Sequence, residues 1–286
     1  MHPCLNKKNG AKLIYDSQEY FKGQYAKYSK PLRDWVVRAE SLNIGSVDIL
    51  IATTTVMLNQ LISDYQLKGP SLRVRNLPSG RMLVKPPNTN QNKDTAEPVR
   101  LIWHGMTIYF NNTRGVHILL KAVALCKSNV HLVLQGLITE EQLKIFESYK
   151  SELKLQGKVS ILPPADPYSI VHSLSKYDIG LIGELAQEDN QMLTSSNKLF
   201  DFLNAGLTVI ASEMPGLNET INEYQVGFSY PPGNYSKMAE IIDTLAENKT
   251  LLHEMKKRAL EISAKELFWE KDYNRLWDIM QTGLQK

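Results

Sequence analysis

Short apolar runs alternate with longer amphipathic segments along nearly the whole chain, and this alternation predicts strands and helices in turn. Several runs carry apolar residues at consecutive positions, which is typical of parallel strands covered by helices on both faces. Seven strands are predicted, at Lys12–Tyr15, Asp48–Ala52, Val99–Trp103, Val130–Leu134, Val159–Leu162, Ile179–Ile182 and Thr208–Ala211. Because the segments between them have helical length, we predict an α/β protein built from doubly wound units.

Four of the amphipathic segments show recognisable helix signals. The apolar residues of Arg114–Lys127 fall on one helical face. Thr139 with Gln142 has the spacing of a capping box, and Asp166 before a proline combines an N-cap with a first-turn proline. Asn234 precedes a further amphipathic helix. These signals predict where the helices between the strands begin.

A stretch rich in proline and asparagine, residues 78–98, interrupts the periodic pattern and is predicted to be an interdomain linker. Residues 1–77 before it carry about two strands, too few for a stable doubly wound domain. Residues 99–265 after it carry a complete one. The last segment, residues 266–286, is predicted to be an amphipathic helix that packs back on the first part, with Tyr273, Leu276, Trp277 and Met280 on one face.

The composition is that of an ordinary globular protein, with 43% hydrophobic and 22% charged residues among 286. Lys and Arg exceed Asp and Glu by 33 to 30, and this net charge of +3 is too small to favour a nucleic-acid partner. No apolar run is long enough to cross a membrane, and the first twelve residues lack the apolar core of a secretion signal. Two cysteines, Cys4 and Cys126, favour a reducing compartment. We therefore expect a cytoplasmic protein.

Four basic residues lie near the start of the linker: Arg73, Arg75, Arg81 and Lys85. They are expected to form a solvated surface. The alternative is a peripheral contact with anionic headgroups at the inner face of the membrane.

The segment from Ser195 to Ser212 carries the clearest chemistry. Ser196 is predicted to cap a helix that follows the strand ending near Ile182, and such a helix N-terminus is a ready anion site. Lys198 adds a positive charge where a diphosphate would lie. Asp201, three residues further on, shares its face and offers a carboxylate to a ribose diol. The alternative is a structural helix in which Lys198 and Asp201 pair with each other.

This region resembles the retaining glycosyltransferases of GT-B fold, the glycosyl transferases group 1. That family has a helix of the form N-K-L-[FY]-E-[FY]-x-x-A-G followed by a strand P-V-I-A-S. Here residues 197–206 read NKLFDFLNAG and residues 208–212 read TVIAS. Further similarities are Trp103-His104-Gly105, Arg114-Gly115, Asp178-Ile179-Gly180-Leu181, Pro215-Gly216-Leu217-Asn218-Glu219 and Gly227. The resemblance covers about residues 99–280 and extends weakly to residues 12–21.

The resemblance implies a GT-B-like fold, with one complete Rossmann-like domain that binds a UDP- or GDP-linked sugar and a partial, acceptor-side N-terminal domain. The substrate-binding residues that it implies are Arg114, Ser195, Ser196, Asn197, Lys198, Asp201 and His104. Transfer would retain the anomeric configuration and use no metal and no cofactor. Arg114, Lys198 and the helix N-terminus would stabilise the leaving diphosphate.

The sequence departs from the family pattern at two positions. The family often has an acidic residue eight positions before Asp201, where this chain has Leu193; the nearby Glu184, Glu188 and Asp189 are the candidates to replace it. Gln18 stands where the family has a histidine. Separately, Glu219 is expected to serve the dipole of its own helix rather than contact a donor.

We therefore expect a glycosyltransferase that moves a sugar to a glycan or lipid-linked acceptor, in bacterial surface-polysaccharide biosynthesis. One alternative is a truncated or degenerate donor-binding protein that acts as a partner subunit without transferase activity. A less favoured alternative is a nucleotide-sugar epimerase of the same fold. The first strand, near Lys12–Tyr15, is expected to leave a sheet edge that a partner chain or dimer mate covers.

Overall fold

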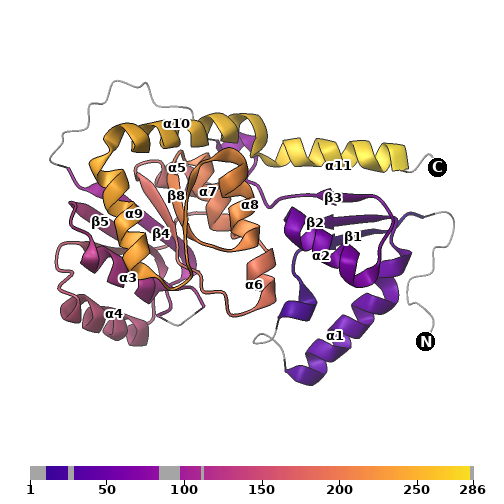
Figure 1. Cartoon of the computed structure of the whole chain (residues 1–286), viewed down its shortest axis with the longest axis horizontal. Helices are drawn as coiled ribbons and strands as arrows, with labels where there is room; N and C mark the ends of the chain where they lie inside the picture. The colour runs from indigo at the N-terminus through magenta and orange to yellow at the C-terminus, as the bar shows by residue number, and fades with distance from the viewer. Residues whose placement is uncertain (1–10, 25–28, 84–96, 111–112, 284–286) are drawn as a thin grey trace.

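The computed structural model describes residues 11–24, 29–83, 97–110 and 113–283. Within them the chain forms two parallel sheets, a smaller one of order β1-β2-β3 and a larger one of order β6-β5-β4-β7-β8-β9 (Figure 1). The strands are β1 (Ile14–Ser17), β2 (Ile49–Ala52), β3 (Ser71–Arg73), β4 (Val99–Thr107), β5 (Val130–Leu137), β6 (Val159–Leu162), β7 (Ile179–Ile182), β8 (Thr208–Ser212) and β9 (Gly227–Tyr230). The α/β fold class and all seven predicted strands are confirmed.

Two strands were not predicted. β3 has only three residues and β9 carries Gly227 and Ser229 among its four, so neither shows an apolar run. Both are held by pairing with one neighbour, β3 with β2 and β9 with β8. The first part of the chain thus has three described strands, where the sequence pattern indicated two.

Helices cover both faces of the larger sheet. One face packs against α3 and α9, and the other against α5, α7 and α8, while α10 contributes to both cores. The α-helices are α1 (Lys30–Asn43), α2 (Thr55–Tyr65), α3 (Val116–Leu125), α4 (Glu140–Glu152), α5 (Ile170–Leu174), α6 (Asp189–Leu193), α7 (Asn197–Asn204), α8 (Pro215–Tyr224), α9 (Tyr235–Glu247), α10 (Lys249–Glu266) and α11 (Trp269–Gly283). Short 3₁₀ helices occur at Phe21–Gly23, Ile44–Ser46 and Gly80–Met82.

The predicted helix starts differ in how they are capped. Asn234 accepts a hydrogen bond from the backbone N–H of Lys237 at 2.9 Å, as an N-cap should. The Thr139 hydroxyl accepts from the Gln142 N–H at 3.3 Å, but the Gln142 side chain accepts from Phe110 instead of closing the capping box. The Asp166 carboxylate accepts a hydrogen bond from the Tyr168 backbone N–H in a turn before α5, and Ser169, not Asp166, occupies the N-cap position of the helix.

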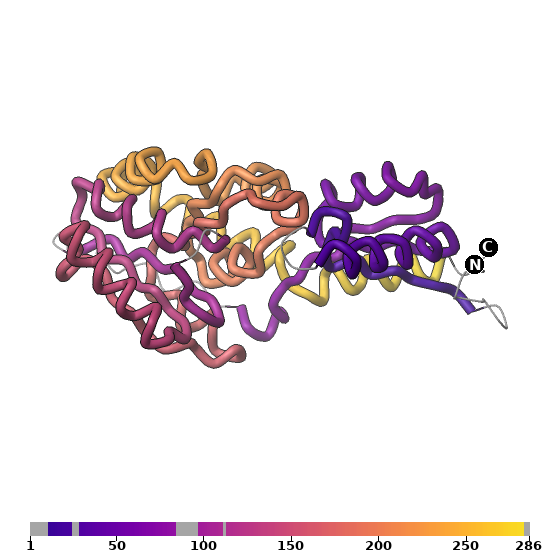
Figure 2. Tube along the Cα trace, turned by 90° about the horizontal axis from the view of Figure 1, so that it is seen from below, coloured from indigo at the N-terminus to yellow at the C-terminus, as the bar shows by residue number. Residues whose placement is uncertain are grey.

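The smaller sheet has different partners on its two faces. Tyr20 and residues of α2 pack on one face, and Leu276 and Ile279 of α11 pack over Ile51 and Leu72 on the other. Figure 2 shows α11, in yellow, running from the larger body along the smaller one. On this helix Tyr273 and Trp277, expected to share the packing face of Leu276, remain 44% and 46% exposed.

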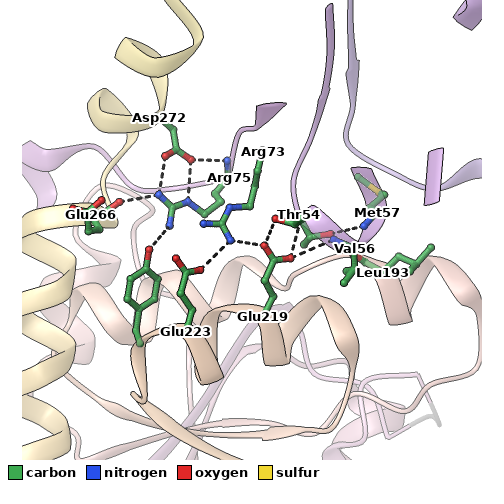
Figure 3. Close-up of polar contacts among 12 residues, drawn as sticks. Thr54, Val56, Met57, Arg73, Arg75, Leu193, Glu219, Glu223, Glu266 and Asp272 are labelled. Carbon is green, nitrogen blue, oxygen red and sulfur yellow. Dashed lines mark hydrogen bonds and ion pairs between the residues drawn. The ribbon is translucent and has the colours of Figure 1, made fainter. Parts of the chain in front are cut away.

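Buried polar contacts join the two halves (Figure 3). The Arg75 guanidinium, only 2% exposed, donates two hydrogen bonds to Asp272 at 2.9 and 2.7 Å, and its backbone N–H donates to the same carboxylate. Arg73 pairs with Glu219 and, at 3.1 Å, with Glu223. The expectation of a solvated basic surface is therefore wrong for Arg73 and Arg75, because acidic groups from distant segments cover them.

Arg81 is exposed, as expected, whereas Lys85, Cys4 and the central part of the proposed linker, residues 84–96, lie outside the described residues. Among the helices that the structure describes, none combines the length and the apolar character needed to cross a membrane.

Candidate functional site

The predicted site residues gather where the strand order of the larger sheet reverses. From β4 the chain continues outward through β5 and β6, and from β7 it continues in the opposite direction through β8 and β9. Ligands of open α/β sheets bind in the crevice at the carboxyl ends of the strands at such a switch point. The segments that meet there are the end of β4, the loops before α3 and after β7, and the start of α7.

The backbone at this point is unusually close-packed. Gly115, the N-cap of α3, has φ +63°, and a Cβ on it would lie 1.7 Å from the carbonyl oxygen of Gly183, just after β7. A side chain at Gly115 would push the loops apart, and one at Gly183 would meet the Leu119 side chain at 2.9 Å. The two glycines therefore bring Arg114 and Glu184, their neighbours in sequence, to the same place.

Glu184 is the centre of the polar contacts in the crevice. Its Oε1 accepts hydrogen bonds from Lys198 Nζ at 2.9 Å, from Arg114 Nη1 at 3.1 Å and from the Ser196 hydroxyl at 3.3 Å. Three predicted substrate-binding residues thus converge on one carboxylate. The Lys198 side chain is 10% exposed and that of Arg114 is 55% exposed, so only Arg114 is largely in solvent.

Two cations and one carboxylate leave the cluster with a net positive charge. Burial raises the pKa of Glu184, but the nearby charges of Lys198 and Arg114 outweigh it, so that the pKa is lowered overall. Glu184 is therefore ionised at neutral pH. Lys198 Nζ also lies 5.7 Å from the centre of the Trp103 ring. Glu184 offsets only one of the two cations that contact it, and this arrangement near the N-terminus of α7 suits a polyanionic ligand.

His104 and Asp201 form a second polar pair next to this cluster. His104 Nε2 lies 3.5 Å from Asp201 Oδ2, with side chains 13% and 19% exposed. Burial and the charge of Lys198 lower the pKa of His104 to about 3, so the imidazole is neutral at pH 7. Burial raises the pKa of Asp201 to about 6, and Lys198 only partly opposes this. At pH 7 the pair is a neutral imidazole beside a buried carboxylate.

The raised pKa of Asp201 predicts a pH-dependent cost to folding. A carboxyl whose pKa rises from 3.8 to about 6 on folding stabilises the folded state fully below pH 3.8, and this contribution is lost as the pH rises through about 6. We expect Asp201→Asn to gain about 2–3 kcal/mol of unfolding free energy, relative to wild type, between pH 4 and pH 7. Urea unfolding of both proteins across this range measures the difference.

His104 contributes to the same pH range with the opposite sign, because its pKa is lowered on folding. It is present in both proteins, so the difference between them isolates Asp201. Glu213→Gln, which alters an exposed carboxyl, is the matched control and should leave the pH profile unchanged. Parallel profiles for wild type and Asp201→Asn would contradict the raised pKa.

The remaining predicted residues line the start of α7. Ser196 occupies the N-cap position, but its hydroxyl contacts Glu184 and Lys198 instead of the helix N–H groups, so the predicted side-chain cap is wrong. Asn197 is exposed at the first helical position. Within the described residues, the buried Ser195 hydroxyl has no hydrogen-bond partner. Lys198 contacts Glu184, and Asp201 contacts His104. This disfavours the alternative in which Lys198 and Asp201 pair with each other to stabilise the helix.

The structure also separates the three acidic candidates for the missing family carboxylate. Glu184 lies in the site, whereas Glu188 precedes α6 and Asp189 is an exposed residue at its start. Leu193 faces the smaller sheet, where it packs with the core around Leu58, and its carbonyl accepts from Thr54. The central role of Glu184 had no distinct sequence signal beyond its place just after a buried strand and a glycine.

Glu219 serves another helix rather than its own. Its carboxylate accepts from the backbone N–H groups of Thr55 at 2.8 Å and Val56 at 3.4 Å, at the N-terminus of α2, and it pairs with Arg73 (Figure 3). The expectation that it serves the dipole of α8 is therefore wrong. Because α2 belongs to the smaller sheet, no pattern local to α8 could reveal this contact.

Comparison with protein families places the larger sheet in a known group. The family model described as "Glycosyl transferases group 1" matches residues 98–248, more than half of the 286 residues. No curated protein sequence matches the chain.

Solved structures share the fold over nearly the whole chain. HepE from Anabaena, in complex with UDP, is 17% identical with a TM-score of 0.74, over 95% of this chain and 72% of that one. Sucrose-phosphate synthase from Thermosynechococcus elongatus is 17% identical with a TM-score of 0.71, over 94% and 66% of the two chains. TarM is 13% identical with a TM-score of 0.71, over 96% of this chain and 51% of that one. The architecture is thus that of the GT-B glycosyltransferases.

Proposed function

This chain belongs to the glycosyl transferases group 1 family, and on that basis we propose that it transfers a sugar, with retention, from a UDP- or GDP-linked donor held at the β4–β7 switch point. The convergence of Lys198, Arg114 and Ser196 on Glu184 supports this assignment most directly. The same cations can hold the diphosphate of a donor when it lies beside Glu184. The family membership identifies the chain as a glycosyltransferase.

In the proposed complex the diphosphate lies over the N-terminus of α7. Lys198, close to Glu184 and mostly buried, supplies a fixed charge, and the half-exposed Arg114 exchanges its single contact with Glu184 for the diphosphate. As the bond to the sugar breaks, negative charge grows on the diphosphate. Preorganised cations and helix N–H groups stabilise such developing charge most where water is excluded.

The nucleoside is proposed to extend from the diphosphate toward Asp201. The Asp201 carboxylate, 19% exposed and ionised at neutral pH, is placed to accept hydrogen bonds from a ribose diol. The adjacent His104 is neutral at this pH, so it adds no positive charge that competes for the carboxylate. Binding of the ribose explains why Asp201 is a carboxylate at a position where burial of a charge is costly.

The acceptor is proposed to be a glycan or a lipid-linked sugar in surface-polysaccharide biosynthesis, at the cytoplasmic face of the membrane, and the reaction to need no metal or cofactor. Support for a nucleotide-sugar donor and a glycan acceptor comes from structures of similar fold. HepE has been solved with UDP-glucose, and S. aureus TarM with UDP, fondaparinux and α-GlcNAc-glycerol. Both combine a nucleotide or nucleotide sugar with a fold that this chain shares.

Asp201→Asn tests where the nucleoside lies. We expect this variant to bind UDP or GDP about five- to tenfold more weakly, because hydrogen bonds to a charged group contribute more than those to an amide. Binding of inorganic pyrophosphate, which has no ribose, should be nearly unchanged. Isothermal titration calorimetry of the three ligands at pH 7.5 measures both effects.

Equal losses for the nucleotide and for pyrophosphate would show that Asp201 only supports α7. Glu213→Gln is the matched control, since it alters an exposed carboxyl near the next strand. Release of sugar from UDP-glucose or GDP-mannose, measured on the same preparation, distinguishes a transferase from a protein that only binds the donor.

A further inference from the structure

The segment between β7 and α7 begins and ends in the candidate site but contacts the smaller sheet in between. Glu184 lies just after β7, and Ser196, whose hydroxyl contacts Glu184, occupies the N-cap position of α7. Between these two residues the chain forms α6, which Figure 1 shows on the side of the larger sheet that faces the smaller one. We refer to residues 183–196 as the α6 segment.

Asn190, on α6, contacts the smaller half of the chain with both ends of its side-chain amide. Its Oδ1 accepts a hydrogen bond from the Tyr20 backbone N–H at 2.6 Å, and its Nδ2 donates to the Glu19 carboxylate. Asn190 is 8% exposed and Tyr20 is 7% exposed, so water has little access to this contact. Separating the two would leave buried polar groups without partners, which is costly.

Both ends of α6 are held against the smaller half. Near its start, Asp189 is so close to Gly23 that a Cβ on that glycine would lie 2.6 Å from the Asp189 Cβ. At its end, the Leu193 side chain packs with the core around Leu58, and the Leu193 carbonyl accepts from the Thr54 hydroxyl (Figure 3). The position of α6 is therefore set by the smaller half of the chain.

The same helix leads directly into the start of α7. The Thr194 backbone N–H and hydroxyl both donate to the Asn190 carbonyl, at 3.0 and 2.7 Å. Only Ser195 separates Thr194 from Ser196, the N-cap residue of α7. Because one residue leaves little slack, a displacement of α6 displaces the backbone N–H groups at the start of α7.

We propose that Asn190 is a positioning residue for the donor, because it ties the smaller half of the chain to the start of α7. This role rests on the proposed function, in which the diphosphate lies over the N-terminus of α7. Donor binding and the contact between Asn190 and Tyr20 are then coupled, and such a coupling acts in both directions. Breaking the contact weakens donor binding, and a bound donor stabilises the contact.

Asn190→Ala is expected to bind UDP or GDP about five- to tenfold more weakly, within the usual range of coupling between two sites. Inorganic pyrophosphate should weaken by the same factor, because the displaced groups lie at the diphosphate. Isothermal titration calorimetry measures both losses. Arg73→Gln, which breaks a different contact between the two halves, is the matched control and should leave both affinities unchanged.

A paired exchange separates positioning from a loss of folding. Asn190→Asp alone places a second carboxylate beside Glu19 and should weaken nucleotide binding as Asn190→Ala does. Combined with Glu19→Gln, it restores a donor and an acceptor between the two side chains and still accepts from the Tyr20 N–H. The double variant should bind within about twofold of wild type, as expected for two residues in direct contact. Circular dichroism checks that each variant is folded.

Hydrogen exchange of the Tyr20 amide measures the contact in the wild-type protein. A saturating concentration of UDP or GDP should slow this exchange by about fivefold or more. The Arg75 amide, which donates to Asp272 in another contact between the halves, is the control. Its exchange should not change.

Four results would overturn the proposal. They are wild-type nucleotide affinity in Asn190→Ala, an equal loss in Arg73→Gln, a double variant that binds as weakly as Asn190→Ala, and nucleotide that fails to slow Tyr20 exchange more than Arg75 exchange. Each would leave the donor site of the proposed function intact. A wild-type protein that binds neither UDP nor GDP would instead overturn the proposed function, and the role of Asn190 with it.

Discussion

Arg75→Met is expected to lower the free energy of unfolding by about 3–5 kcal/mol, the range for breaking one side of a buried ion pair. Asp272 is fully buried, and its two oxygens accept from the Arg75 guanidinium and backbone. Without the guanidinium, the cationic contact that remains to Asp272 among the described residues is Arg275, 3.6 Å away and 46% exposed. The Glu266 carbonyl also loses a hydrogen bond. Urea unfolding measures the loss.

The effect should be specific to the pair that joins the two halves of the chain. Arg81→Met, at an exposed position of the same basic stretch, is the control and should change stability by less than about 0.5 kcal/mol. The double variant Arg75→Met with Asp272→Leu should recover much of the loss, since it removes both charges together. If Arg75→Met costs no more than Arg81→Met, the ion pair does not fasten α11 to the segment after β3.

Lys198→Ala is expected to weaken the binding of UDP or GDP by about 1.5–3 kcal/mol, which is about 10- to 150-fold in affinity. Lys198 is the buried cation of the cluster, 2.9 Å from Glu184, and its loss leaves Arg114 as the only cation in contact with that carboxylate among the described residues. The net charge of the cluster then falls to zero. Inorganic pyrophosphate should lose affinity by a similar factor, because Lys198 is placed against the diphosphate.

Calorimetric titration of wild type and Lys198→Ala measures both losses. Glu184→Gln is the informative companion: it releases Lys198 and Arg114 from their carboxylate and should preserve or improve pyrophosphate binding. If Lys198→Ala binds nucleotide as tightly as wild type, the diphosphate does not lie over α7. If Glu184→Gln loses as much affinity as Lys198→Ala, Lys198 acts mainly by holding Glu184 in place.

The strands and the donor-side helix could be predicted because their causes are local. Seven apolar runs match strands, and those of β2, β7 and β8 are buried at every position, so they need no distant residue to explain them. The sequence NKLFDFLNAG likewise indicates α7 with Lys198 near its start, and the structure brings Arg114 close to the same helix. The short strands β3 and β9 were missed because pairing with one neighbour, and not their own apolar content, holds them.

Only the tertiary structure determined the partners of the charged residues. Arg73 and Arg75 have the local appearance of a solvated basic surface, yet acidic residues from α8 and α11 cover them. Glu219 has the appearance of a residue that serves its own helix, yet it caps α2, 164 residues away from Thr55 in sequence. Glu184 was one of three candidates until the Gly115–Gly183 contact brought it to Arg114 and Lys198. A charged side chain takes its partner from whatever the fold places within a few ångströms, so local sequence determines the helices and strands, and the fold determines which charges meet.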